Sequence, residues 1–96
     1  MTQALTPDQL TDALETLPRW SLKDGKLHRT MKFGSFSEAL AFMVRLGIEA
    51  EKSDHHPELF NVYSTVTVEL TTHDAGGITM LDVALAEAVD RLAGEA

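Results

Sequence analysis

Apolar residues recur at helical spacing in three segments of the chain, and the segments between them read as strands and turns. The first helical pattern follows Thr6, a suitable N-cap because Gln9 stands where a capping-box partner belongs. Pro7 fits the first helical position, and Pro18 ends the helix near Leu17. Its predicted apolar face is Leu10, Ala13, Leu14 and Leu17, with Leu5 and Leu10 forming a hydrophobic staple.

A hairpin is predicted next, because Asp24-Gly25 is a strong turn dipeptide between two segments with strand character. These segments are Trp20–Leu22 and Lys26–Phe33, and the second shows the apolar–polar alternation of a half-buried strand. Arg29 interrupts the apolar side of this strand. We therefore expect Arg29 to lie near an edge of the sheet or to reach past it.

The second helix is predicted to begin with a capping box formed by Ser35 and Glu38 and to run towards Lys52. Pro57 disfavours a helical backbone at His56, so the helix must end at or before that histidine. The side expected to be buried consists of Phe36, Ala39, Leu40, Met43, Leu46, Gly47 and Ala50.

The segment from Leu59 to Thr72 is predicted to be extended, as one strand or as two strands that bend near Tyr63-Ser64. A loop at residues 74–77 follows. The last helix is predicted to start at Thr79, with Asp82 at the capping-box position. Its packing face is expected to be Met80, Val83, Ala86, Val89 and Ala93.

The predicted order of elements is α-β-β-α-β-β-α, in one continuous domain over residues 1–96 without repeats or linkers. This order indicates the α+β class. We expect a four-stranded antiparallel sheet with the helices packed on one face.

Composition and charge exclude several classes of function. The chain has 96 residues, with 15 acidic and 8 basic side chains and a formal charge of −7, which argues against binding to nucleic acid or to an anionic membrane. It has no cysteine, so disulfides and thiolate chemistry are excluded. The N-terminal residues lack the basic and apolar regions of a signal peptide, and we expect a cytoplasmic protein.

Candidate chemistry is concentrated in histidines at the ends of predicted elements. His55 and His56 follow the second helix, and His73 follows the longest extended segment. Histidine is the usual proton donor near neutral pH, and the negative end of a helix favours its protonated form. Asp82, at the positive start of the last helix, would stay ionised and could orient an imidazole. The pattern suits acid-assisted elimination or hydration of a small molecule.

The same residues also have structural interpretations. The paired histidines could belong to a solvated loop, His73 could be an exposed strand-end residue, and Asp82 could serve only as a cap. Zinc or iron ligation is a further alternative, but adjacent histidines in an extended segment point to opposite sides. The spacings HxH and HxxxH are absent, so we expect no metal site.

Three motifs together resemble pterin-4a-carbinolamine dehydratase. They are EKSDHHPE at 51–58, FNVY at 60–63 and LTTHD at 70–74, followed by Gly77, Thr79 and Asp82. Trp20 and the predicted helix over residues 36–50 also fit, so the resemblance covers nearly the whole chain. The combination is far more specific than any single motif.

The resemblance implies a dehydratase that converts 4a-hydroxytetrahydropterin to quinonoid dihydropterin, without a metal or organic cofactor. The histidines matching His55 and His73 would act as general acids, and His56 and Pro57 would bind the pterin. Asp82 would support the histidines. The resemblance also implies a functional link to an aromatic amino acid hydroxylase and assembly into a homodimer or homotetramer.

The chain departs from the animal members of this family at two positions. Leu59 stands in place of a tryptophan and Leu81 in place of an arginine, which could alter the pocket rim or the subunit contacts. The resemblance leaves one alternative of another class, a non-catalytic interaction module, such as the coactivator or assembly-factor members of the family. A metal hydrolase is a third possibility. The complete set of histidines favours the dehydratase.

Overall fold

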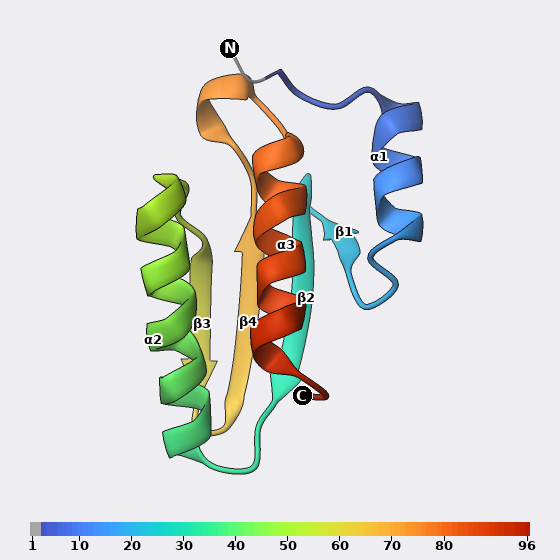
Figure 1. Cartoon of the computed structure of the whole chain (residues 1–96). Helices are drawn as coiled ribbons and strands as arrows, with labels where there is room; N and C mark the ends of the chain where they lie inside the picture. Colours follow the sequence, from blue (N-terminus) through green and yellow to red (C-terminus); the bar gives the residue numbers. More distant parts are fainter. Residues whose placement is uncertain (1–2) are drawn as a thin grey trace.

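The structure is a computed structural model that describes residues 3–96. Its elements are α1 (Pro7–Glu15), β1 (Ser21–Lys23), β2 (Lys26–Lys32), α2 (Phe36–Ser53), β3 (Glu58–Val62), β4 (Thr65–Leu70), a short 3₁₀ helix (His73–Ala75) and α3 (Met80–Ala93). The predicted order is confirmed, and the extended segment after α2 is a hairpin of two strands (Figure 1). The hairpin turns at Tyr63, which takes a left-handed backbone conformation (φ 52°).

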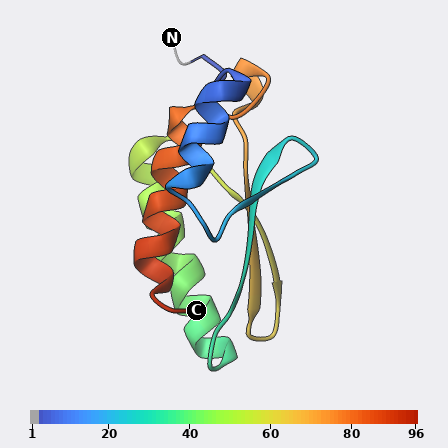
Figure 2. The same ribbon diagram turned by 90° about the vertical axis from the view of Figure 1, so that its right-hand side faces the viewer.

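The four strands form one antiparallel sheet in the order β1-β2-β4-β3. The middle strands β2 and β4 pair from Leu27 opposite Leu70 to Lys32 opposite Thr65. All three helices lie on the same side of the sheet (Figure 2). The predicted α+β class and one-sided arrangement are therefore confirmed.

The core lies between the middle strands and the helices α2 and α3. The buried side chains of the sheet are Leu27, Met31, Val66, Val68 and Leu70, and those of the helices include Ala39, Phe42, Leu46, Ala50, Val83, Leu85, Ala86 and Val89. Alternate residues of β2 and β4 are buried, as expected for a sheet with one covered face.

The buried side of α2 differs from the prediction. Phe36 and Leu40 are 45% and 46% exposed, whereas Phe42, which was not expected inside, is buried. The ring of Phe42 packs against the ring of Phe33, with centroids 5.0 Å apart. Helix α2 packs against both the sheet and α3, so its core side lies between these two neighbours. This orientation leaves an apolar row of α2 outside.

Arg29 corrects a second expectation, because it lies on a middle strand and not at an edge. Its side chain is 3% exposed and pairs with Asp90 of α3, while its Nη2 donates to the carbonyl of Ala96 at 2.7 Å. Trp20 Nε1 donates to the same Asp90 oxygen at 2.8 Å. The arginine therefore ties β2 to the C-terminal end of α3 through buried charge.

The other face of the sheet carries no helix among residues 3–96. It is mostly polar, with Phe60 and Val62 of β3 exposed on it. Thr30 and Thr67 share a hydrogen bond of 2.9 Å across β2 and β4, and His28 Nδ1 lies 2.9 Å from Glu69 Oε2. Lys26 contacts Glu58 at 2.8 Å. The hydrogen bond to Glu58, reinforced by its negative charge, raises the pKa of Lys26.

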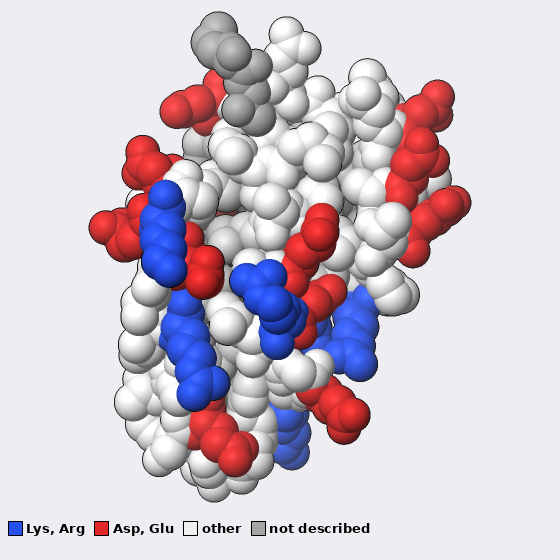
Figure 3. All heavy atoms as spheres, in the orientation of Figure 1, with Lys and Arg blue, Asp and Glu red and all other residues white. Residues whose placement is uncertain are grey.

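Charged side chains are unevenly distributed over the surface. Figure 3 shows acidic groups gathered over α1, whereas uncharged side chains cover much of the outer edge of α2. Within the described part of the chain, no helix combines the length and apolar character needed to cross a membrane.

We predict that Asp90→Ala lowers the free energy of unfolding by about 3 kcal/mol, because it leaves the buried guanidinium of Arg29 without its carboxylate. Glu87→Ala is the matched control, since Glu87 is an exposed acidic residue on the same helix and its loss should change stability by less than about 0.5 kcal/mol. Urea unfolding measures both values. Equal losses in the two variants would contradict this role of Asp90.

Candidate active site

Three chain segments meet at one end of the sheet. The C-terminal end of α2, the segment that follows β4 and the N-terminal end of α3 lie at the top of Figure 1. The predicted functional residues lie in these segments or, for residues 55–57, in the connection that directly follows α2. Residues that are up to 27 positions apart in the sequence can therefore contact one another here.

His55 is positioned by the way in which α2 ends. Asp54 adopts a left-handed conformation (φ 50°), and its N–H turns back to the carbonyls of Ala50 and Glu51. The N–H of His55 donates to the Ala50 carbonyl at 3.1 Å. This closing turn directs the chain away from the helix axis and brings the His55 side chain inward, where it is 9% exposed.

His73 is carried by a short loop that is closed at its base. Thr72 and Gly77 form an isolated antiparallel bridge, with N–H···O distances of 3.0 and 3.3 Å. Between them, residues 73–75 form the 3₁₀ turn, which ends at Gly76 in the left-handed region (φ 74°). The loop therefore presents His73 at the surface beside the end of β4.

Asp82 lies behind these residues, on the first turn of α3, and is fully buried. Its Oδ1 lies 2.6 Å from His55 Nε2. Its Oδ2 accepts hydrogen bonds from the Thr72 hydroxyl at 2.8 Å and from the Thr79 N–H at 2.9 Å. Asp82 is thus both the capping-box residue that the sequence predicts and the partner of one imidazole.

The structure brings the three predicted histidines to one cleft of about 260 Å³. Its lining consists of Asp54, His55, His56, Thr71, Thr72, His73 and Asp74. His56 is exposed, and its Nε2 lies 2.6 Å from Glu51 Oε1. Pro57 is not among the lining residues, and the fourth histidine, His28, lies on the open face of the sheet.

The charge of the cleft limits what it can bind. Asp54 and Asp74 belong to its lining, so it would repel an anion and suits a neutral or cationic ligand. Within residues 3–96, no group of three or more His, Asp or Glu side chains is arranged to hold a metal ion. The chemistry available from the side chains is proton transfer by imidazole, with one imidazole held by a buried carboxylate.

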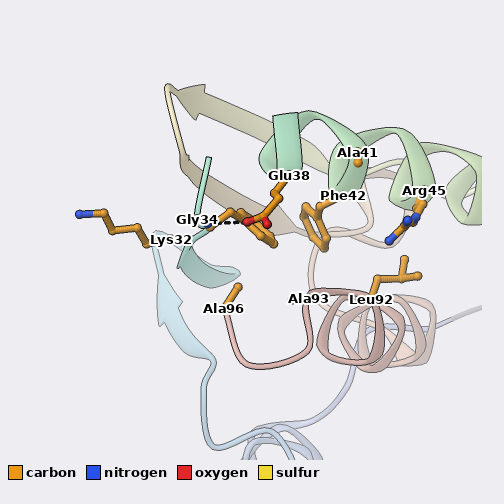
Figure 4. Close-up of a pocket in the computed structure, with 10 residues that line it drawn as sticks. Lys32, Gly34, Glu38, Ala41, Phe42, Arg45, Leu92, Ala93 and Ala96 are labelled. Atoms are coloured by element: carbon orange, nitrogen blue, oxygen red, sulfur yellow. Dashed lines mark hydrogen bonds between the residues drawn. The ribbon is translucent and has the colours of Figure 1, made fainter. Parts of the chain in front are cut away.

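A larger cavity, of about 430 Å³, lies at the opposite end of α2 (Figure 4). It lies between the β2–α2 connection, α2 and the end of α3. Within it, the N–H of Gly34 donates a hydrogen bond to the carboxylate of Glu38. None of the four histidines lines this cavity. The smaller cleft therefore remains the candidate active site.

Two partners of Asp82 were not predicted from the sequence. Thr72 was placed in the extended segment and in the LTTHD motif, and Thr79 at the start of the last helix and in the family resemblance, but neither was given a role at the site. Both contribute donors to Asp82. The hydroxyls of the two threonines also lie 2.8 Å apart. A signal was present in the position of Thr72, directly before a candidate histidine, but the partner of its hydroxyl depends on the fold.

Comparisons with known proteins point to one family. The family model described as pterin 4 alpha carbinolamine dehydratase matches residues 3–92. A Bradyrhizobium protein named "Putative pterin-4-alpha-carbinolamine dehydratase" is 53% identical over 97% of this chain and 96% of its own length. A Prochlorococcus marinus protein of the same name is 50% identical over 92% of both chains.

Two solved structures are similar to this one. A Brucella melitensis protein described as a transcriptional coactivator/pterin dehydratase superposes with a TM-score of 0.92 at 41% identity, covering 96% of this chain and 100% of its own. A pterin dehydratase-like protein described as a RuBisCO assembly factor of the alpha-carboxysome gives a TM-score of 0.65 at 28% identity, over 81% and 90% of the two chains.

The fold and the sequence thus place this protein among the pterin dehydratases and the proteins that share their fold. In particular, the chain belongs to the pterin 4 alpha carbinolamine dehydratase family. The resemblance deduced from the three motifs is confirmed.

We predict that Gly76→Ala lowers the free energy of unfolding by about 1–2 kcal/mol, because a residue with a Cβ is strained at φ 74°. Gly77→Ala is the control. Its added Cβ would meet Ala4 at an ordinary 3.6 Å and needs no left-handed backbone, so a change below about 0.5 kcal/mol is expected. Denaturant unfolding of the two variants tests this, and an equal effect would exclude a strained turn at Gly76.

Proposed function

We propose that this protein dehydrates 4a-hydroxytetrahydropterin to quinonoid dihydropterin and water. The observation that supports this best is the meeting of three imidazoles at one cleft, one of them backed by a buried carboxylate. Family membership supports the same class of substrate. The acidic lining is compatible with an uncharged heterocycle.

The reaction needs an acid because hydroxide is a poor leaving group near neutral pH. Proton transfer to the C4a hydroxyl lets the C4a–O bond break and water leave. The lone pair of N5 forms the C4a=N5 double bond, and N5 loses its proton to solvent or to a basic side chain. General acid catalysis of this kind contributes about 10²–10⁴-fold to a rate.

The proposed roles follow the positions of the side chains. His55 and His73, which approach the cleft from different elements, would donate the proton, and Asp82 would orient His55. His56, which lines the cleft, would hold the pterin at the rim. Pro57, which follows it outside the lining, would support this binding by fixing the backbone next to His56. The proposed reaction requires neither a metal nor an organic cofactor.

The substrate chemistry also suggests a place in metabolism. A 4a-hydroxypterin arises when a tetrahydropterin donates electrons to oxygen in an aromatic amino acid hydroxylase. We propose that such an enzyme supplies the substrate in the cytoplasm and that a reductase consumes the product. The dehydratase would then act in pterin recycling.

We predict that replacing both His55 and His73 with alanine lowers the rate of carbinolamine dehydration by at least about 100-fold. His28→Ala is the matched control, because His28 lies outside the cleft on the open sheet face and its loss should leave the rate unchanged. Decay of freshly generated carbinolamine, followed by absorbance, measures the rate. Circular dichroism checks that the variants are folded.

Unchanged turnover in the folded double variant would refute the assignment. Loss of activity after treatment with a chelator would instead support the metal-hydrolase alternative. Activity that persists in the chelator and disappears in the double variant is the result expected for histidine acid catalysis.

A second candidate function, that of an interaction module, is favoured by an apolar row on α2. Phe36, Leu40, Val44 and Ile48 recur every four residues and are 45–56% exposed. A row of this kind on a soluble protein marks an interaction surface. We propose that it mediates self-association into a homodimer or homotetramer, since a two-fold axis would bring the same row of two chains together.

We predict that the double variant Leu40→Glu/Val44→Glu is monomeric, because two carboxylates would be buried in the proposed interface. Arg45→Glu is the control. This substitution also changes the net charge by −2. Arg45 lies on the side of α2 that lines the cavity in Figure 4, away from the apolar row. Sedimentation over a concentration series should show assembly of the wild type and the control only, and a monomeric wild type would contradict the proposal.

A further inference from the structure

The buried hydrogen bonds around Asp82 indicate which ring nitrogen of His55 can act on the substrate. We propose that Thr72 and Thr79 are positioning residues that hold Asp82 so that His55 carries a proton on Nε2. Nδ1 of His55 is then the atom that faces the substrate. This inference rests on the proposed dehydratase function and goes beyond it, because it names the working atom and the residues that select it.

The network is sealed from water on its inner side. Asp82 and Thr79 have no exposed surface, and His55 is 9% exposed. Buried polar groups must find their hydrogen bonds within the protein, so the partners of each atom can be counted. This count leaves a single arrangement of protons.

The direction of each hydrogen bond follows from the number of protons available. An ionised Asp82 can only accept, so the Thr72 hydroxyl donates its one proton to Oδ2 at 2.8 Å. The hydroxyl of Thr79, 2.8 Å from that of Thr72, must then be the donor in the pair. Thr79 Oγ1 in turn accepts from the Leu81 N–H at 3.1 Å.

The remaining oxygen of Asp82 selects the tautomer of His55. Among residues 3–96, the one hydrogen-bond partner of Oδ1 is His55 Nε2, at 2.6 Å, and as an acceptor Oδ1 requires a proton on that nitrogen. Nδ1 has no hydrogen-bond partner among residues 3–96 and is not sealed from solvent. It is therefore free to protonate a leaving hydroxyl when the ring is cationic.

The same threonines also fix the loop that carries His73. The backbone of Thr72 is held by Gly77, and Thr79 caps α3. The hydroxyl–hydroxyl bond thus joins the two ends of the loop over residues 73–78 at its base. One network therefore sets the position of both proposed acids relative to each other.

Thr72→Val tests the role of the hydroxyl with almost no change in side-chain volume. We expect kcat to fall by roughly tenfold or more, with a smaller change in KM, because misplacement of a catalytic group affects the chemical step most. Thr72→Ser keeps the hydroxyl and should restore most of the rate. Thr30→Val is the matched control, since it breaks a threonine pair of 2.9 Å on the open face and should change neither parameter.

The ring nitrogens of His55 provide a readout that a merely structural role would not change. In ¹⁵N-labelled wild-type protein, the neutral ring should show a protonated Nε2 and an unprotonated Nδ1, and Thr72→Val should give a mixture of tautomers. A wild-type ring protonated on Nδ1 would overturn the inference. Wild-type kcat together with an unmixed tautomer in Thr72→Val, or no rescue by Thr72→Ser, would also overturn it.

The two hypotheses fail separately. If the wild-type protein does not dehydrate the carbinolamine, the proposed function is wrong, whereas the tautomer of His55 is still decided by the spectrum. If the wild type is active and its His55 carries the proton on Nδ1, the proposed function stands and the positioning network is wrong.

Discussion

A carboxylate without access to water organises one end of this protein. Asp82 has no exposed surface, so its two oxygens must be satisfied by donors within the chain. Those donors come from the turn after α2, from the segment that follows β4 and from the cap of α3. Because the three segments approach one carboxylate, His55, His56 and His73, which lie in or next to these segments, are held around one cleft.

The opposite end of α3 follows the same physical rule with the charges reversed. There the buried group is the guanidinium of Arg29, and its partners are Asp90 and a carbonyl near the end of the described chain. Helix α3 is thus connected by charged side chains to α2 and β4 at its start and to β2 at its end. The sheet and the helix cannot slide along each other without breaking one of these buried contacts.

Local signals in the sequence predicted the elements well, because capping residues, turn dipeptides and prolines act over a few positions. Thr6, Ser35 and Thr79 are N-caps as expected. Contacts between distant segments were harder to predict. Arg29 was expected near an edge because it interrupts the apolar side of its strand, and local sequence could not reveal its partner Asp90, which is 61 residues away. Phe42 was missed because α3 decides which side of α2 is covered. The candidate histidines were identified by residue type and by motif, whereas their convergence and the two threonines behind them required the fold.

The loop between Thr72 and Thr79 has a consequence for how this scaffold could be altered. Its ends are tied by a backbone bridge and by a pair of hydroxyls, so an insertion or deletion inside it would disturb the position of His73 relative to His55. Substitution of outward-facing residues within the loop leaves those ties in place. An engineer wishing to change which ligand the cleft accepts should therefore vary side chains there and keep the number of residues constant.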